Sequence, residues 1–196
     1  MKKTMKFLIG LITAILITGT ASAQHGNAPE GHVSLGIKGG LNLYNINNDN
    51  GSTYDQITTY HFGLLGHIHL KNPWAIQPEL VYSEQGAKSG ETNYNLGYIN
   101  VPVLIQYMFD NGFRLQAGPQ VGFLVSADNK DDLNSIEFGV SFGVSYVVPS
   151  TGFGIDARYN LGLSNINKDS DLNSTNRGLQ FGIFYIFGHN SKIVIE

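Results

Sequence analysis

Apolar and polar side chains alternate with a period of two residues through most of the chain from Val33 to Phe187. Successive side chains of a β-strand point to opposite faces, so the alternation predicts strands with one apolar face. Eight such segments are separated by polar or turn-forming residues: 33–43, 61–70, 74–82, 99–109, 113–123, 136–146, 153–161 and 179–187. Each is close to the length of about 9 to 11 residues that a tilted strand needs to cross a bilayer.

The segment before the first strand has the features of a secretory signal peptide. Lys2, Lys3 and Lys6 precede an apolar run at 7–20, and Ala21-Ser22-Ala23 supplies small residues for cleavage before Gln24. The apolar run is shorter than the 20 or so residues of a membrane-spanning helix, which argues against an anchor. We therefore expect a signal peptide at 1–23, a short N-terminal segment at 24–32, a barrel at 33–188 and a C-terminal tail at 189–196.

The connections between the predicted strands alternate in length. Three are tight turns, at 71–73, 110–112 and 149–152, whereas the stretches 45–58, 84–95, 126–135 and 164–177 are long and polar. Short periplasmic turns opposite long extracellular loops are typical of outer-membrane barrels. The four long stretches carry nine acidic and four basic residues, so we expect acidic extracellular loops. An even number of strands places both ends of the barrel on the periplasmic side.

A soluble, lipocalin-like barrel is the main alternative, because alternation alone does not say which face points outward. Charged residues make up only 14% of the chain, against about a quarter in soluble domains. The polar face consists mainly of Gly, Ser, Gln and Asn, which suit the narrow interior of an eight-stranded barrel. Its charges are three basic and three acidic, as pairing in a buried interior requires: Lys38, Glu79, Arg114, Glu137, Asp156 and Arg158. We therefore predict a closed, all-β, eight-stranded antiparallel up-and-down transmembrane barrel whose lumen holds this charge network.

Aromatic residues on the apolar face gather beside the short turns and at the exit of the last strand. Membrane interfaces favour such rings, so we predict a girdle at the periplasmic interface. Its members are Trp74, Tyr107, Phe109, Phe113, Tyr146, Phe153 and Phe187. Tyr60 and Tyr82 mark the opposite rim more sparsely.

Five strings in register resemble the PorT-like family of bacterial outer-membrane β-barrel proteins: GIKGGLNL (36–43), IQPELVYSEQGAK (76–88), YINVPVLIQY (98–107), FRLQAGPQVGFLVSA (113–127) and DARYNLGLSNI (156–166). The resemblance covers the whole mature chain. It implies an eight-stranded barrel that is exported by a signal peptide to the outer membrane of a Gram-negative cell. One branch of the family is linked to protein secretion and gliding, whereas most members have no assigned activity.

Pro78, Pro102 and Pro119 lie inside predicted strands, although proline cannot donate a hydrogen bond to a neighbouring strand. We expect a bulge or a local kink at each.

No pattern in the sequence predicts catalysis, a cofactor or a metal site. His61, His67 and His69 lie on the polar face of one predicted strand, so we interpret them as residues that fill the lumen. Three imidazoles on one strand lie too far apart to form one tetrahedral metal site. Asp169, Asp171 and Asn173 lack the glycine and the closing glutamate of a calcium loop, and Asp131-Asp132 are interpreted as solvated acids. Ser141 and Ser145 have no nucleophile elbow around them. With no cysteine and a formal charge that falls from −3 to −6 after signal removal, thiolate metal sites and nucleic-acid binding are disfavoured.

The sequence thus favours a structural or accessory outer-membrane barrel with a filled lumen rather than an open pore, because open channels need roughly 16 strands. The alternatives are a component of protein secretion or envelope assembly that acts through a partner, and a loop-side binder of lipid or a small ligand. The expected partners are outer-membrane lipid, the barrel insertion machinery and a secretion or envelope complex.

Overall fold

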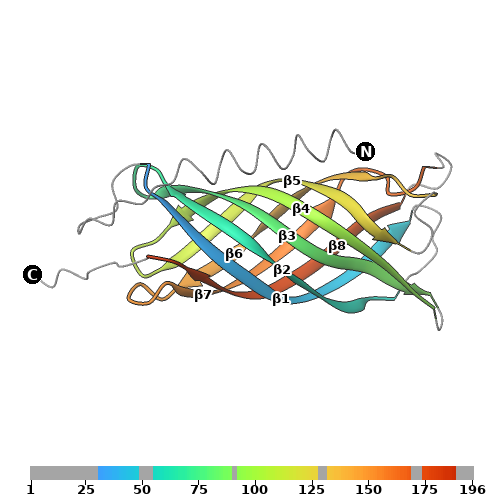
Figure 1. Ribbon diagram of the computed structural model, residues 1–196, viewed down its shortest axis with the longest axis horizontal. Coiled ribbons are helices and arrows are strands. Elements are labelled where there is room, and N and C mark those ends of the chain that lie inside the picture. Colours follow the sequence, from blue (N-terminus) through green and yellow to red (C-terminus); the bar gives the residue numbers. More distant parts are fainter. Residues whose placement is uncertain (1–30, 49–54, 90–91, 128–131, 169–173, 189–196) are drawn as a thin grey trace, which may run out of the picture.

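The computed structural model describes residues 31–48, 55–89, 92–127, 132–168 and 174–188. These residues form eight strands: β1 (Val33–Asn48), β2 (Ile57–His69), β3 (Trp74–Ser89), β4 (Thr92–Met108), β5 (Phe113–Ala127), β6 (Ile136–Val147), β7 (Phe153–Gly162) and β8 (Ser174–Ile186). Each strand pairs antiparallel with the next, and β8 pairs with β1 to close the barrel (Figure 1). The predicted closed eight-stranded antiparallel barrel is therefore confirmed. The described ranges hold no helix that is long and apolar enough to cross a membrane.

Several predicted segments lie outside the described residues. They are the signal peptide at 1–23, all of the segment 24–32 except Gly31 and His32, and the tail at 189–196. The same holds for seven of the charged residues in the long stretches: Asp49, Glu91, Asp128, Lys130, Asp131, Asp169 and Asp171.

At the loop end the strands are longer than the alternation predicted. β3 and β4 stay paired from Trp74↔Tyr107 to Ser89↔Thr92, so the stretch 84–95 is almost entirely a β-ribbon rather than a loop. Glu84, Lys88 and Arg177, which were assigned to loops, therefore lie in strands. These ends bear polar residues on both faces, so the apolar alternation that revealed the strands is absent from them.

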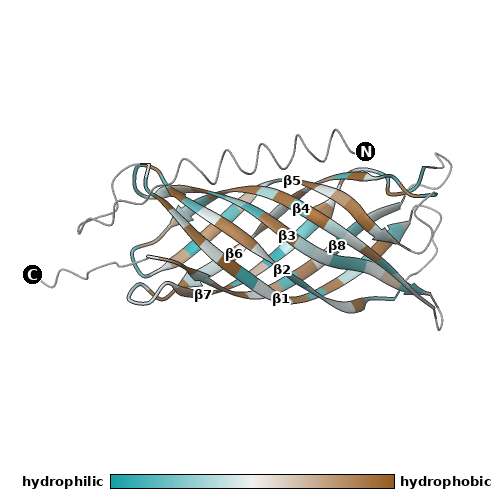
Figure 2. Ribbon diagram, in the orientation of Figure 1, coloured by the Kyte–Doolittle hydropathy of each residue, from teal (hydrophilic) through white to brown (hydrophobic). Residues whose placement is uncertain are grey.

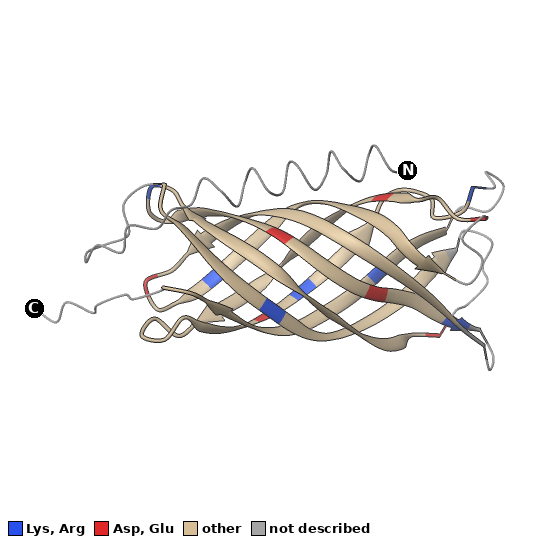
Figure 3. Ribbon diagram, viewed as in Figure 1, with Lys and Arg blue, Asp and Glu red and all other residues tan. Residues whose placement is uncertain are grey.

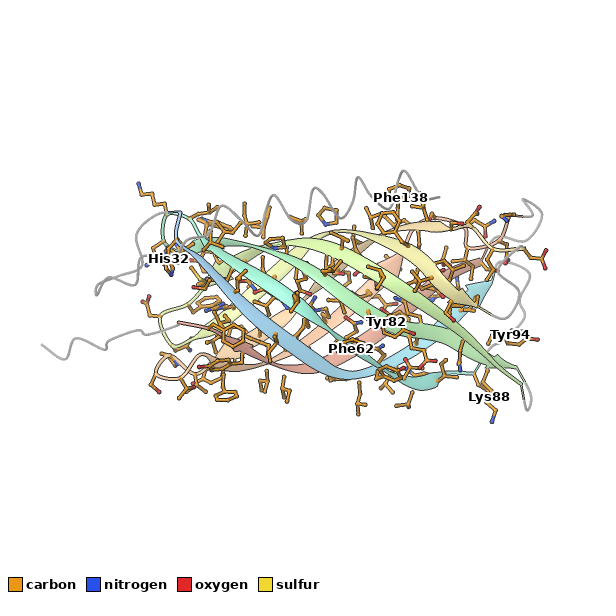
Figure 4. The ribbon with its side chains drawn as sticks, in the orientation of Figure 1. His32, Phe62, Tyr82, Lys88, Tyr94 and Phe138 are labelled. Carbon is orange, nitrogen blue, oxygen red and sulfur yellow. The ribbon has the colours of Figure 1, made fainter. Side chains whose placement is uncertain are left out.

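Three tight connections join the strands at the opposite end, which is the left end in Figures 1 and 4, beside His32. The amide of Gly112 donates to the carbonyl of Phe109 (3.0 Å), and the amide of Trp74 donates to the carbonyl of Lys71 (3.0 Å). Gly112 and Gly152 have φ angles of +89° and +77°, which residues with a side chain rarely adopt. The turn chemistry thus fixes one end of the barrel as compact.

The polar phase of every strand points into the barrel and the apolar phase points out. Outward side chains such as Ile183 (70%) and Phe138 (56%) are exposed, whereas Lys38, Glu79 and Arg158 are buried. Apolar and polar residues alternate along the ribbons in Figure 2, and Phe138 projects from the wall in Figure 4. A lipocalin-like arrangement with an apolar interior is therefore excluded for this barrel.

The three strand prolines do not cause the expected bulges. The pairing register is the same on both sides of Pro78, Pro102 and Pro119. Each proline, however, is itself unpaired with one neighbouring strand: Pro78 with β2, Pro102 with β3 and Pro119 with β4. The register shifts instead between Gly97 and Tyr98, where β4 pairs with β5. Each proline therefore interrupts pairing locally but leaves the register intact.

A lysine in the middle of the outward face tests whether this face contacts lipid. Leu64→Lys on β2 should lower the free energy of unfolding by about 2 to 4 kcal/mol, because a charge at the bilayer midplane is costly. Thr58→Lys has the same phase near the loop end of β2 and should cost about 0 to 1 kcal/mol. Urea unfolding of the barrel refolded into phospholipid vesicles measures both. Equal and small effects would mean that water covers this face.

Candidate functional site in the lumen

Four charged side chains from three strands meet inside the barrel. Lys38 of β1 lies 3.0 Å from Asp156 of β7 and 3.4 Å from Glu79 of β3. Arg158, also on β7, contacts the same two carboxylates. None of the four side chains is more than 3% exposed. Two cations and two anions thus form a neutral cluster, which we call the lumen quartet (Lys38, Glu79, Asp156, Arg158).

Arg158 is the centre of the quartet. Its Nη1 and Nη2 donate to the two oxygens of Glu79 at 2.9 and 3.0 Å, and its Nε donates to Oδ2 of Asp156 at 2.9 Å. This bidentate geometry is the strong form of a carboxylate contact and fixes the guanidinium plane. Because Glu79 belongs to β3 and Arg158 to β7, the contact joins opposite walls of the barrel. The quartet therefore braces the lumen as well as neutralising it.

A chain of amides extends the quartet across the neighbouring strands. Gln77 donates to Glu79 (2.7 Å), and Gln106 donates to both Gln77 and Gln116 (2.9 Å each). On the side of the quartet that faces the loop end, Asn42 donates to the carbonyl groups of Tyr60 (2.9 Å) and Glu84 (2.8 Å). The interior is therefore held by a network of hydrogen bonds, as buried polar groups require.

Arg114 and Glu137, the other two predicted members of the charge network, do not join the quartet. Arg114 lies near the turn end with Nη1 3.5 Å from Nδ1 of His67, and Glu137 lies near the loop end and accepts from Asn176 (3.0 Å). No ion pair is formed by either residue within the described part of the chain. The expectation that all six charges pair with one another is therefore wrong, because the strand tilt separates two of them along the barrel axis. Figure 3 shows how few charged residues lie on the strands.

Two apolar clusters lie on either side of this polar region. At the turn end Leu65, Val147, Phe184 and Ile186 pack together. At the loop end Leu96, Tyr98, Leu124 and Ile166 do the same. Sequence reasoning missed both clusters, since their strand residues lie on the phase that is mostly polar. Their signal was the break in alternation at pairs such as Leu64-Leu65 and Val147-Val148.

The predicted aromatic girdle residues lie beside the short turns on the outer face. All are exposed except Phe113, which is half-buried. Ring centroids of neighbours are 5.1 Å apart for Trp74–Tyr107 and 5.0 Å for Tyr107–Phe109. Tyr185, which was not assigned to the girdle, lies 4.6 Å from Phe153 and 5.2 Å from Phe187. Tyr185 has the same outward phase as Phe187, which follows two residues later, so the sequence pattern could have placed Tyr185 in the girdle.

Tyr60, Phe62 and Tyr82 form a smaller aromatic cluster, and Figure 4 shows Phe62 and Tyr82 near the middle of the wall rather than at the opposite rim, where the sequence predicted Tyr60 and Tyr82. The ring centroids of Phe62 and Tyr82 lie 5.3 Å apart, and those of Tyr60 and Tyr82 lie 6.1 Å apart.

His61 and Ser141 contact amide side chains of the lumen, whereas the Ser145 hydroxyl has no hydrogen-bond partner among the described residues. His61 Nδ1 lies 2.7 Å from Oδ1 of Asn42, and the Ser141 hydroxyl donates to Asn160 (2.6 Å). Across the described ranges, three or more His, Cys, Asp or Glu side chains nowhere converge to hold a metal ion. Asp169, Asp171 and Asn173 lie outside those ranges.

The fold and the inverted polarity define the class: a β-barrel that spans a membrane. Residues 22–168 match the family model described as "Outer membrane protein beta-barrel domain". The chain belongs to this outer-membrane β-barrel family and is an envelope protein of the outer membrane. No curated protein matches its sequence.

Two solved structures share the architecture. Neisserial surface protein A (NspA) is similar with a TM-score of 0.51 and 16% identity, over 78% of this chain and 97% of that one. Ail, the attachment invasion locus protein of Yersinia pestis, has a TM-score of 0.51 and 16% identity, over 81% and 100% of the two chains. At this identity the similarity concerns the fold alone.

Removing the central cation of the quartet should destabilise the barrel strongly. Arg158→Ala leaves two buried carboxylates facing Lys38 alone, and breaking a buried pair in this way costs about 3 to 5 kcal/mol. The matched control is Lys71→Ala, which removes a cation from an exposed turn and should be nearly neutral. Urea unfolding followed by heat-modifiable gel mobility measures both. Two equally harmless substitutions would show that water reaches the quartet.

Proposed function

We propose that the protein is a non-conducting structural or accessory barrel of the outer membrane, sealed through its lumen. The observation that carries this proposal is the lumen quartet between two apolar clusters. Lys38, Glu79, Asp156 and Arg158 fill the cross-section with neutral pairs, and Leu65 and Leu96 belong to the clusters at either end. An ion would have to break several buried contacts to pass, and the interior of an eight-stranded barrel leaves no room for a bypass.

We also propose the route by which the chain reaches the membrane. The basic start at Lys2, Lys3 and Lys6 and the small residues at 21–23 favour export through a cleaved signal peptide. The outer-membrane insertion machinery would then be a transient partner, and lipid a permanent one. The loop end would face the outside of the cell and present the acidic residues of the loops.

A second candidate function, a PorT-like role in secretion or envelope assembly through a partner, is favoured by the ribbon at the loop end. β2 and β3 pair as far as His61↔Ser83, and an isolated bridge joins Asp55 to Lys88, whereas β3 and β4 stay paired to Ser89↔Thr92. Tyr94 on this ribbon is 45% exposed, and Figure 4 shows Tyr94 and Lys88 at the far end of the barrel. An extended ribbon with an exposed aromatic residue is suited to binding another protein. A loop-side lipid or small-ligand binder remains a further proposal for the same end.

Electrical recording tests the sealed lumen. The purified barrel in planar bilayers should show no steady large conductance, because the quartet and the apolar clusters fill the lumen. A sixteen-stranded porin inserted in the same bilayers is the positive control for the recording. Stable openings of high conductance would contradict the proposal.

Mass spectrometry of the chain purified from outer membranes tests export. The mature protein should begin at Gln24 and co-fractionate with outer-membrane markers. A chain that still begins at Met1, or a soluble periplasmic pool, would contradict the proposed route.

Affinity purification from detergent-solubilised membranes separates the structural role from the partner-dependent one. Reproducible secretion or envelope components that are lost with Lys88→Ala/Tyr94→Ala favour the second function. Their absence with a stably folded bait favours the first. Lys71→Ala, which removes a cation at the opposite end of the barrel, is the control.

A further inference from the structure

Glu137 is a buried carboxylate that lacks a cationic partner. It is 8% exposed and accepts a hydrogen bond from Nδ2 of Asn176, which carries no charge. The cations of the quartet are engaged with Glu79 and Asp156. Burial of an ionised carboxylate is costly unless its charge is compensated. No cation among the described residues therefore compensates this carboxylate at the loop end of the lumen.

Three more oxygen-bearing side chains, those of Tyr98, Asn100 and Asn176, lie around Glu137 and come from other strands. Asn100 of β4 and Glu137 of β6 lie in one row across β5, with Gly122 between them. A Cβ at Gly122 would lie 2.7 Å from Oδ1 of Asn100 and 3.7 Å from Cβ of Glu137. On the other side, a Cβ at Gly162 would lie 2.5 Å from Oε1 of Glu137. The two glycines thus provide the space in which these oxygens lie.

The oxygens of this group are buried and unsatisfied. The Tyr98 hydroxyl, Oδ1 of Asn100 and Oδ1 of Asn176 have no well-formed hydrogen bond within the described residues. Tyr98, Asn100 and Asn176 are 0%, 2% and 1% exposed. Buried polar atoms nearly always have a partner, so a group of three beside an uncompensated carboxylate indicates a ligand. The apolar cluster of Leu96, Leu124 and Ile166 adjoins Tyr98 and shields the group at the loop end.

We propose that Glu137, Tyr98, Asn100 and Asn176 bind one hard cation, Ca²⁺ or Na⁺, in the loop end of the lumen. Carboxylate, amide and hydroxyl oxygens are the ligands that such ions prefer, and water completes the coordination of Ca²⁺, which takes about 6 to 8 oxygens. The four residues include no imidazole or thiolate, which disfavours zinc and copper. Mg²⁺ demands a near-ideal octahedron and keeps several waters, which suits a confined site of side chains less well. This cation site is an addition to the proposed function, because a sealed lumen does not require a bound cation.

Unfolding experiments on the mature barrel, refolded in detergent, test the proposal with CaCl₂, NaCl or tetramethylammonium chloride at equal ionic strength. A cation that binds only the folded state raises stability with the logarithm of its concentration. The urea midpoint should therefore rise with Ca²⁺ or Na⁺ but not with tetramethylammonium, and the two metal salts identify the ion. Glu137→Gln should abolish the dependence, whereas Glu84→Gln, which removes an outward acid at the same end, should retain it.

Terbium provides a second readout that does not depend on the folding of Glu137→Gln. Tb³⁺ in the site should emit on tyrosine excitation, Ca²⁺ should compete, and Tyr98→Phe should reduce the emission severalfold. An equal midpoint shift in Glu137→Gln, or emission unchanged by Tyr98→Phe, would place the ion on the loop acids and overturn the proposal. A urea midpoint of the parent barrel that does not change with Ca²⁺ or Na⁺, together with no terbium emission, would overturn the proposal in favour of a protonated Glu137.

Discussion

The neutral pairing of Lys38 and Arg158 with Glu79 and Asp156 is the constraint on which the rest of the structure depends. The lipid-facing wall leaves a narrow interior, and charges in such an interior persist only when they are paired and hydrogen-bonded. The phase of β1, β3 and β7 must therefore put these four residues inside. Since side chains alternate along a strand, the same choice puts Ile37, Leu80 and Ile155 outside. One electrostatic requirement thus agrees with the hydrophobic requirement of the bilayer.

Along its axis the lumen is arranged in layers. Apolar side chains lie at both ends, the quartet and its amide neighbours lie between them, and the two unpaired charges lie beyond the quartet on opposite sides. Inward glycines make this arrangement possible. A Cβ at Gly154 would lie 2.3 Å from the ring of Phe184, so the ring occupies the space that a side chain on β7 would fill. Glycine at this position therefore lets a large ring pack against bare backbone.

The closed barrel, the strand order and the inward phase of the charges were predictable because a bilayer imposes alternation on every strand that crosses it. Beyond the bilayer that requirement ends, so the paired ribbon at Glu84–Ser89 looked like a loop. The partners of the charges were not predictable either. The alternation predicts that Arg114 and Glu137 point inward. Their distance from the other charges along the barrel axis depends on strand tilt and register, which a period of two does not encode. The apolar clusters were missed for a related reason: Leu65 and Phe184 are single exceptions within polar phases.

The seam between the first and last strands determines how the barrel can form. β1 pairs with β8 from Gly36↔Ile186 to Asn48↔Ser174, so the wall has two open edges until the end of the chain is present. Open edges are excluded from hydrocarbon because their backbone groups would find no hydrogen-bond partners. A growing chain thus cannot insert strand by strand as a helical membrane protein can. The wall therefore loses its open edges only when β8, the last strand in the chain, has paired with β1.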